Sequence, residues 1–347
     1  MRLPDAIFQS AVEPPYVIAE VAQTHDGSLG LAHAFIDAIA RTGADAVKFQ
    51  THLAGAESTS REPFRVPFSR ADATRFEYWE RTGFTEEQWA GLKLHAEQRD
   101  LVFLSSPFSL EAAELLQRLN VLAWKVGSGE LDSQRMIDFL IATGKPIILS
   151  TGLSSYQEVD DLAGRMAAAA PGRHVLMQCT TAYPTPPEKV GLNVLLDYQR
   201  RYSCPVGLSD HSGTPWPGVM AAWHGARVIE VHATLSRDLF GPDVSSSLTI
   251  EELASLVNGV RFAQVMRNSP VQKDALAAAA APLRRMFGKS AVARRALAVG
   301  AAVDEAAVAF RKPGEGIPEK EFAPFLGRRL KRPVAANAAF QEEDFEK

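Results

Sequence analysis

Short apolar segments alternate with longer amphipathic segments along most of the chain. The amphipathic segments carry apolar residues at spacings of three and four, which is the pattern of a helix with one buried face. The apolar segments are rich in Val and Ile and nearly continuous, which indicates strands buried on both faces of a parallel sheet. Eight such segments begin at Tyr16, Asp45, Leu101, Leu122, Pro146, His174, Pro205 and Arg227. Eight strand–helix units predict an α/β protein with a (β/α)8 TIM barrel of about 250 residues.

An open, doubly wound parallel sheet is the alternative architecture. Such a sheet often binds a dinucleotide through a GxGxxG turn after its first strand. The corresponding stretch here, "AEVAQTHDGSLG", does not fit that motif. The barrel is therefore the preferred interpretation.

Two segments depart from the strand–helix rhythm. Residues 53–85 form a long predicted loop with interleaved aromatic and basic residues, and a loop of this length inside a compact domain is usually functional or a lid. After a connecting stretch from Gln272 to Lys289, the pattern changes to short pieces up to the last residue. We therefore predict two domains, residues 1–285 and residues 286–347, the second small enough to need docking against something else.

Composition narrows the class of protein. The chain is 46% hydrophobic and 22% charged, with a net charge of -4, so it lacks the basic excess of a nucleic-acid-binding protein. Its two cysteines, Cys179 and Cys204, do not make a disulfide framework and fit a reduced compartment. The first 20 residues lack the apolar core of a signal peptide, and no run reaches the roughly 18 apolar residues of a membrane span. The expectation is a cytoplasmic globular protein with no membrane or nucleic-acid partner.

Polar residues follow the apolar runs in strand after strand. In a TIM barrel the carboxyl ends of the strands carry the active site. Two lysines among several hydroxyls and glycines suit a ligand that carries a phosphate and a carboxylate. The strand-end residues are Glu20, Lys48, Gln50, His52, Ser105, Ser106, Lys125, Ser128, Glu130, Ser150, Thr151, Thr180, Tyr183, Ser209, Asp210, His211, Glu230 and His232.

His211 and His232 are separated by one strand–helix–strand unit, so they should end neighbouring strands. Two neutral imidazoles a few ångströms apart can hold a borderline divalent metal. The competing interpretation is that each is a hydrogen-bonded histidine at a strand end. Other residues have alternatives too: Lys48 and Lys125 could reach solvent, and Glu130 could cap the next helix.

Nine stretches in order resemble the N-acetylneuraminate (sialic acid) synthase family. They are "VIAEVAQTHDGSLGLA", "GADAVKFQTH", "FLSSPFSLEAAELL", "AWKVGSGE", "GKPIILSTGL", "QCTTAYPTP", "VGLSDHSG", "VIEVHATLSRDLFGPDVSSSL" and "FRKPGEGI". The resemblance implies a catalytic (β/α)8 barrel followed by a small antifreeze-like (SAF) domain. It also implies a domain-swapped homodimer, in which the small domain supplies an arginine to the partner's site.

The resemblance assigns roles to individual residues. It implies condensation of phosphoenolpyruvate with an N-acylated hexosamine, with Mn²⁺ or Mg²⁺ held by His211 and His232, and Glu130 as acid/base. Glu20, Tyr183 and Asp243 would face the amino sugar, and Arg311 or Lys312 would reach it from the small domain. The implied phosphoenolpyruvate site is Lys48, Ser106, Lys125, Ser128, Thr151 and Ser209.

Some positions depart from the family pattern, such as Thr181, Val231, Val244 and the order Arg311–Lys312. No metal ligand and no lysine is lost, so the departures concern the sugar. N-acetylmannosamine and the diacetamido sugars of legionaminate- or pseudaminate-type synthases remain open. A phosphoenolpyruvate-condensing barrel that uses a phosphorylated aldose is a further alternative. It would need extra basic residues for the second phosphate, and Arg61, Arg65 and Arg70 in the long loop are the candidates. A non-catalytic sugar-binding module is another, because fold alone does not establish function.

Overall fold

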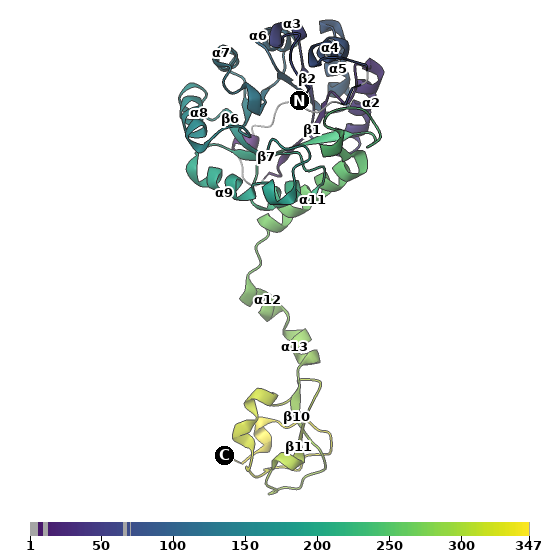
Figure 1. Cartoon of the computed structure of the whole chain (residues 1–347). Helices are drawn as coiled ribbons and strands as arrows, with labels where there is room; N and C mark the ends of the chain where they lie inside the picture. Colours follow the sequence, from purple (N-terminus) through teal and green to yellow (C-terminus); the bar gives the residue numbers. More distant parts are fainter. Residues whose placement is uncertain (1–5, 10–12, 65–67, 70, 347) are drawn as a thin grey trace. The chain divides into compact units, whose positions relative to one another are not determined.

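The computed structural model describes residues 6–9, 13–64, 68–69 and 71–346. Contacts within the chain divide it into two compact units, residues 1–269 and residues 270–347. In Figure 1 the first unit runs from purple to green and the second from green to yellow. The predicted limit between residues 285 and 286 stays a prediction.

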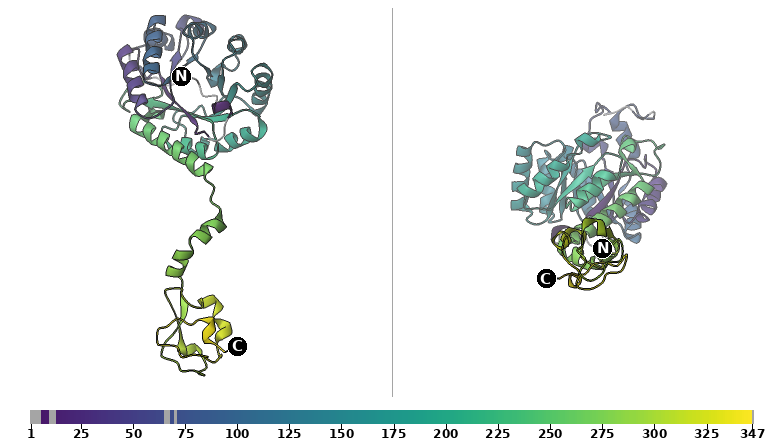
Figure 2. Two further views of the ribbon diagram at one scale, coloured as in Figure 1. Left: turned by 180° about the vertical axis from the view of Figure 1, so that it is seen from behind. Right: turned by 90° about the horizontal axis from the view of Figure 1, so that it is seen from below.

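In the described part of the first unit, a helix follows each of eight parallel strands, and these helices lie around the outside of the strands (Figures 1 and 2). The strands are β1 (Tyr16–Ala22), β2 (Ala46–Thr51), β3 (Val102–Pro107), β4 (Trp124–Val126), β5 (Ile147–Ser150), β6 (His174–Cys179), β7 (Val206–Asp210) and β8 (Val228–Thr234). The helices are α2 (Leu29–Ala40), α5 (Glu86–Gln98), α6 (Leu110–Arg118), α7 (Gln134–Ala142), α8 (Tyr156–Ala169), α9 (Leu192–Arg201), α10 (Trp216–Trp223) and α11 (Ile250–Asn268).

The strands close into a nearly complete barrel. Hydrogen-bonded pairing runs in the order β3-β2-β1-β8-β7-β6-β5-β4, and the two end strands of this order, β3 and β4, contact each other. A short strand β9 (Leu248–Thr249) pairs with β8 beyond the ring. The predicted (β/α)8 barrel is confirmed, and each of the eight apolar runs forms one of its strands.

The inner face of the barrel changes character along each strand. Near the amino ends, inward side chains such as Ile18, Ala46 and Ile148 form an apolar cluster that fills the barrel. Two residues further on, the same face carries Glu20 and Lys48, because side chains of a strand point alternately to opposite faces. The opposite face packs against the helices in the main core. The polar side chains therefore collect at the carboxyl end of an otherwise filled barrel.

The segment between β2 and α5 is more ordered than the predicted loop of residues 53–85. It contains helices α3 (Ala54–Glu57) and α4 (Arg75–Thr82), and α4 begins with a capping box between Thr74 and Glu77. Tyr78 and Trp79 of α4 are buried in a small apolar cluster of their own, together with Phe64, Phe68 and Phe76. The prediction of a long loop missed these helices, because α4 packs in a local cluster and carries aromatic residues on its buried face. Residues 65–67 and 70, which include Arg65 and Arg70, lie outside the described residues.

The second unit contains helices α12 (Lys273–Ala279) and α13 (Ala281–Phe287), the antiparallel strands β10 (Ser290–Ala293) and β11 (Val308–Arg311), and several short 3₁₀ turns. Its own core is built on Phe322, Phe340 and Phe345.

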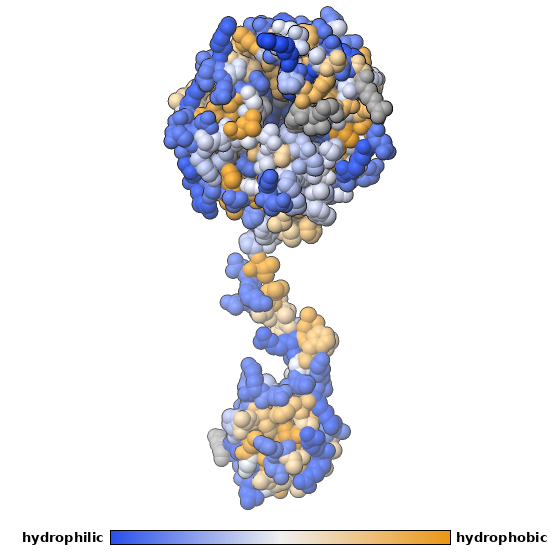
Figure 3. Space-filling view, in the orientation of Figure 1, coloured by the Kyte–Doolittle hydropathy of each residue, from blue (hydrophilic) through white to orange (hydrophobic). Residues whose placement is uncertain are grey.

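Hydrophilic residues cover much of the outer edge of the barrel unit in the view of Figure 3. Among the described residues, no helix is long and apolar enough to cross a membrane.

Candidate active site

A cavity opens at the carboxyl ends of the barrel strands. Its lining brings together residues from all eight strands and from the turns that follow them, although these residues are far apart in the sequence. Ten of the residues predicted for the site line this cavity: Glu20, Lys48, Ser106, Lys125, Ser128, Tyr183, Ser209, His211, His232 and Asp243.

Strand register fixes the neighbours inside the cavity. Glu20 is paired with Lys48 on one side and with His232 on the other, so β1 carries a carboxylate between a lysine and a histidine. Ser209 of β7 is paired with Glu230 of β8 in the same way. Because residues in register on parallel strands point to the same face, these side chains must meet at one level of the barrel.

Two lysines and two glutamates form a buried charge cluster. Lys48 contacts Glu20 in an ion pair and lies 3.6 Å from Oε1 of Glu230, while Lys125 lies 3.1 Å from the same oxygen. Burial alone disfavours the charged forms, but the glutamates raise the pKa of Lys48, and both lysines lower the pKa of Glu230. Each lysine also donates a hydrogen bond to a serine, Lys48 to Ser106 at 3.1 Å and Lys125 to Ser150 at 3.0 Å. The ammonium group of Lys48 is thus held charged, and both lysines are almost fully buried.

His211 directly follows β7 and His232 lies in the second half of the neighbouring strand β8, so the two histidines are close together as their spacing predicted, with ring centroids 5.3 Å apart. Nδ1 of His211 donates to the backbone oxygen of Thr180 at 2.9 Å, and the hydroxyl of Tyr183 lies 3.1 Å from Nε2. Burial and the nearby His232 lower the pKa of His211 to about 3, so its imidazole is neutral. A backbone carbonyl on one ring nitrogen is the usual way to orient a metal-binding histidine through the other.

The histidine pair fits a divalent metal. Nδ1 of His232 is buried and has no hydrogen-bond partner within the described part of the chain. Neutral imidazole nitrogens are metal ligands, and the positions they leave open would take substrate or water. Within the described ranges, no group of three or more His, Cys, Asp or Glu residues is placed to hold a metal. An ion bound by this pair would take its further ligands from substrate or water.

Three predicted site residues are not part of the cavity lining. The hydroxyl of Thr151 hydrogen-bonds the backbone oxygen of Met177 at 3.0 Å and the hydroxyl of Tyr198 at 2.8 Å. Glu130 ends the 3₁₀ turn Ser128–Glu130, whose first two residues do line the cavity. Arg311 belongs to the second unit, where it hydrogen-bonds Asn337.

Glu130 has the proton affinity of a general base. Burial, and next the charge of Glu57, raise its pKa to about 7. A carboxyl group with a pKa near neutrality can take a proton and release it again under ordinary conditions. Glu130 lies close to the cavity because Ser128 and Gly129, the first two residues of the same turn, line it.

Two comparisons of the sequence with protein families cover almost the whole chain. The model of the NeuB family matches residues 35–272, which is more than half of the chain. The chain belongs to the NeuB family. A model of the SAF domain matches residues 288–346, so the predicted small domain is present at the end of this NeuB-family chain.

Relatives of this NeuB-family chain are similar over nearly their full lengths. An N,N'-diacetyllegionaminic acid synthase from Campylobacter jejuni is 29% identical, covering 90% of this chain and 94% of the relative. The human N-acetylneuraminate-9-phosphate synthase is 30% identical over 95% of this chain and 92% of its own. A sialic acid synthetase structure from Leptospira borgpetersenii shares the fold, with a TM-score of 0.68 and 24% identity over 79% of this chain and 94% of that one.

The structure also adds site residues that the sequence patterns did not single out. Gln23 lines the cavity, is almost fully buried, and leaves its Oε1 without a hydrogen-bond partner in the described structure. Glu230 was noted only as a strand-end residue, yet it lies between the two lysines. The segment between β2 and α5 adds an aromatic part of the lining: Phe64, Phe68, Tyr78 and Trp79. Sequence periodicity carries no signal for Gln23, which follows its strand by one residue.

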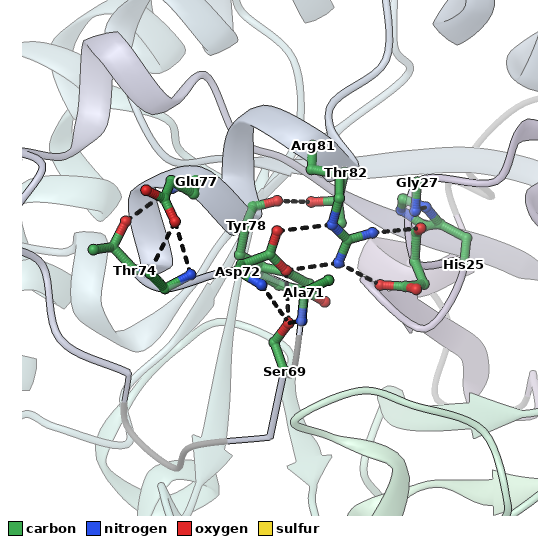
Figure 4. A network of polar contacts seen from close by, with 12 residues as sticks. His25, Gly27, Ser69, Ala71, Asp72, Thr74, Glu77, Tyr78, Arg81 and Thr82 are labelled. Atoms are coloured by element: carbon green, nitrogen blue, oxygen red, sulfur yellow. Dashed lines mark hydrogen bonds and ion pairs between the residues drawn. The ribbon is translucent and has the colours of Figure 1, made fainter.

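Arg81 of α4 links the segment between β2 and α5 to the turn after β1 through ion pairs. Its guanidinium lies 2.8 Å from Asp72, just before α4 (Figure 4). It also lies 2.9 Å from Asp26 in the turn after β1. Arg81 also donates to the backbone oxygen of Asp26 at 3.1 Å. Asp72 in turn accepts from the hydroxyl of Ser69 at 2.7 Å. These contacts hold the aromatic side chains of α4 against the cavity.

Proposed function

We propose that this chain condenses phosphoenolpyruvate with an N-acylated hexosamine, giving a nonulosonic acid of the sialic acid type and inorganic phosphate. Membership of the NeuB family and its relatives, which are named sialic, legionaminic and pseudaminic acid synthases, support an enzyme of this kind. The observation that carries the proposal is the cavity itself, with two buried lysines beside a histidine pair.

The lysines suit phosphoenolpyruvate. Lys48 and Lys125 reach the cavity from β2 and β4 and could each contact the phosphate or the carboxylate as point charges. Ser106, Ser128 and Ser209 add hydroxyl donors around them. Together these groups would hold C3 of phosphoenolpyruvate facing the sugar in a near-attack geometry.

The acceptors suit a sugar. Oε1 of Glu20, Oε1 of Gln23 and Oε2 of Glu230 are buried and have no hydrogen-bond donor in the described structure. Unpaired buried acceptors are costly, so a ligand that brings several hydroxyl or N–H donors would be favoured here. A polyhydroxylated amino sugar in its open-chain form brings such donors, with Tyr183 and Asp243 also on the cavity wall.

The reaction balances with groups already in the site. The π electrons of phosphoenolpyruvate form a bond from C3 to the sugar C1, and the C1 oxygen takes up a proton. The cationic C2 that results is attacked by water, whose proton passes to Glu130 as general base. The tetrahedral carbon then collapses: the bond from C2 to the phosphate oxygen breaks, the remaining hydroxyl proton passes to the departing phosphate, and the keto acid is left. Glu130 returns its proton to solvent, which also supplies the proton taken up by the C1 oxygen. A divalent ion, Mn²⁺ or Mg²⁺, on His211 and His232 would supply Lewis-acid polarisation of the sugar aldehyde.

The choice of sugar follows from the charge of the outer cavity. A phosphorylated aldose would need a free basic group there, and Arg75 lines the cavity but lies 2.9 Å from Glu62 in an ion pair. The carboxylate of Glu62 thus offsets the positive charge of Arg75. We therefore favour a sugar without phosphate, either N-acetylmannosamine or a diacetamido sugar of the legionaminate or pseudaminate type.

The assembly we propose is a homodimer in which the SAF domain of one subunit completes the other's site. Arg311 on β11 and Lys312 are the candidate cations, and Lys312 lies 5.3 Å from the ring centre of Phe287. The proposal is tested by measuring phosphate release from phosphoenolpyruvate in Mn²⁺-loaded full-length protein. The sugars would be N-acetylmannosamine, its 6-phosphate and the two diacetamido sugars. No release with any N-acylated hexosamine would overturn it.

A further inference from the structure

His52 is clamped in the wall of the cavity. Its ring stacks on Trp79 of α4 with centroids 3.6 Å apart and an interplanar angle of 6°. On the other side Phe108 stacks on it at 4.1 Å and 21°. A ring held between two aromatic faces cannot tilt, so the directions of its two nitrogens are fixed.

Each nitrogen of this ring meets a specific partner. Nδ1 of His52 lies 2.8 and 3.0 Å from the two carboxyl oxygens of Glu57 on α3. Nε2 lies 3.1 Å from Oε1 of Gln50. The side chain of Gln50 lines the cavity, and its backbone oxygen accepts from Gln23 at 3.2 Å. A chain of hydrogen bonds therefore runs from Glu57 through His52 to an amide on the cavity wall.

The amide oxygen of Gln50 can only accept a hydrogen bond, so Nε2 of His52 must carry the proton. Burial, followed by the charge of Arg75, lowers the pKa of His52 well below its usual value, which leaves the ring neutral and Nδ1 without a proton. Burial, followed by the charge of Glu62, raises the pKa of Glu57 to about 8. A protonated Glu57 then donates to Nδ1, and every partner in the chain is matched.

The charges around this chain come from several elements. Glu62 and Arg75 act on both Glu57 and His52, and Asp243, which follows β8, acts on His52. Glu130, at the end of the turn after β4, is coupled to Glu57. Arg75 favours ionised Glu57, while the carboxylates oppose it.

We infer that Glu57 and His52 are positioning residues for the Gln50 amide. With the proton on Glu57, His52 holds the amide oxygen, and the amide nitrogen is left to donate to an acceptor oxygen of the ligand. The Gln50 nitrogen has no hydrogen-bond partner among the residues described, which leaves it available. That the ligand is an N-acylated hexosamine, with an acyl carbonyl or hydroxyl oxygen as the acceptor, rests on the proposed function.

Loss of the proton from Glu57 reverses the direction of the hydrogen bonds that link Glu57, His52 and Gln50. An ionised carboxylate accepts from Nδ1–H, so Nε2 becomes an acceptor and repels the amide oxygen. The Gln50 amide must then rotate by half a turn and present its oxygen to the ligand. Above the pKa of Glu57, sugar binding weakens by the cost of one mispaired hydrogen bond, about tenfold in KM.

Nitrogen NMR of the full-length protein with ¹⁵N-labelled histidine tests the chain without any substrate. The His52 signals are assigned by their loss in His52→Phe. In the wild type we expect the Nε2–H tautomer at pH 6.5 and the Nδ1–H tautomer at pH 9.5. In Glu57→Gln the side-chain amide donates to Nδ1 at every pH, so the tautomer should not change. A wild-type tautomer that does not change, or the same change in Glu57→Gln, overturns the inference.

The kinetic counterpart uses phosphate release with whichever sugar of the panel is turned over. The sugar KM of the wild type should rise about tenfold from pH 7 to pH 9 with little change in the KM for phosphoenolpyruvate, and Glu57→Gln should abolish that rise. Glu80→Gln, an exposed glutamate of α4, is the matched control and should keep the wild-type profile. A rise that persists in Glu57→Gln contradicts the inference. A tautomer change without turnover of any sugar would instead contradict the proposed function alone.

Discussion

The ammonium nitrogen of Lys125 lies 3.1 Å from Oε1 of Glu230, and the two side chains are only 3% and 6% exposed. The pair joins β4 to β8 across the inside of the barrel. A buried pair of this kind contributes little over apolar packing, but breaking it leaves one charge without a partner. If Lys125 binds phosphoenolpyruvate as proposed, the same contact links the stability of the barrel to substrate binding.

Lys125→Met should lower the free energy of unfolding and also impair phosphoenolpyruvate binding. The destabilisation should be about 3 kcal/mol, since Glu230 loses its nearer partner. Adding Glu230→Leu should restore most of the stability because no charge is then stranded. The double variant should still bind phosphoenolpyruvate poorly. Urea unfolding and phosphate-release kinetics measure the two effects, and recovery of the KM in the double variant would contradict a role of Lys125 in substrate binding.

Most of the barrel could be predicted from the sequence because its signal is local. Each strand is a short Val- and Ile-rich run, and the polar residues that end the runs, such as Lys48 and Lys125, stand out against it. Parallel strands bring their carboxyl ends to one edge, so residues far apart in sequence could be grouped without coordinates. His211 and His232 could be paired in this way from their spacing alone.

The remaining features depend on packing that leaves no periodic trace. Thr151 ends its strand like Ser150, yet its hydroxyl is engaged by Tyr198 of α9, a partner 47 residues away. The helix Arg75–Thr82 has a mean composition too polar to stand out, and its aromatic face becomes meaningful only against Phe64 and Phe68. The link from Glu57 through His52 to Gln50 likewise requires the stacking on Trp79.

His211→Ala should remove metal binding while the barrel stays folded. Loss of even an indirect partner of a metal ligand weakens binding about 10- to 100-fold, so loss of one of two protein ligands should weaken it by more than about 100-fold. Electron paramagnetic resonance of added Mn²⁺ measures the free ion, and circular dichroism checks the fold. His224→Ala, at the end of α10, is the control and should bind like the wild type. Equal Mn²⁺ affinity in His211→Ala would contradict the proposed ligand pair.

Glu130→Gln should lower kcat by about 100- to 10,000-fold, which is the usual contribution of a general base. The base acts as the carboxylate, and its pKa is raised to about 7. The kcat of the wild type should therefore fall as the pH drops below about 7, and Glu130→Gln should lack this acid limb. The raised pKa also means that the folded state favours the protonated acid. Protonated Glu130 therefore contributes stability that is fully present below the pKa of this carboxyl group in the unfolded chain. That stability is lost as the pH rises through about 7. An unchanged kcat profile in the variant would exclude Glu130 as the base.

Phe68→Ala should raise the KM for the sugar and leave the KM for phosphoenolpyruvate nearly unchanged. Phe68 lines the cavity on the side of α4, beside Tyr78 with ring centroids 5.0 Å apart. Loss of its contact with an apolar acyl group should cost about tenfold in KM, the worth of a partly buried aromatic contact. Leu94→Ala, on the exposed face of α5, is the control for a surface substitution. A larger change in the KM for phosphoenolpyruvate than in the KM for the sugar would contradict a contact between Phe68 and the sugar.

Mixing two inactive variants tests whether the small domain acts on the partner subunit. His211→Ala disables the barrel, and Arg311→Ala disables the small domain. If Arg311 acts across a two-fold dimer, each mixed dimer has one site with an intact barrel and an intact arginine. Random exchange of subunits in an equal mixture should then restore about a quarter of the wild-type activity.

The two arrangements give different results in this mixture. If Arg311 served its own barrel, both sites of a mixed dimer would carry one lesion and activity would stay absent. Lys312→Ala in place of Arg311→Ala is the matched control, because Lys312 is the neighbouring cation and is engaged with Phe287. We expect Lys312→Ala alone to keep most of its activity, so that Arg311 is the cation that reaches the sugar. Phosphate release after subunit exchange measures the outcome, and loss of activity in Lys312→Ala but not in Arg311→Ala would reverse the assignment.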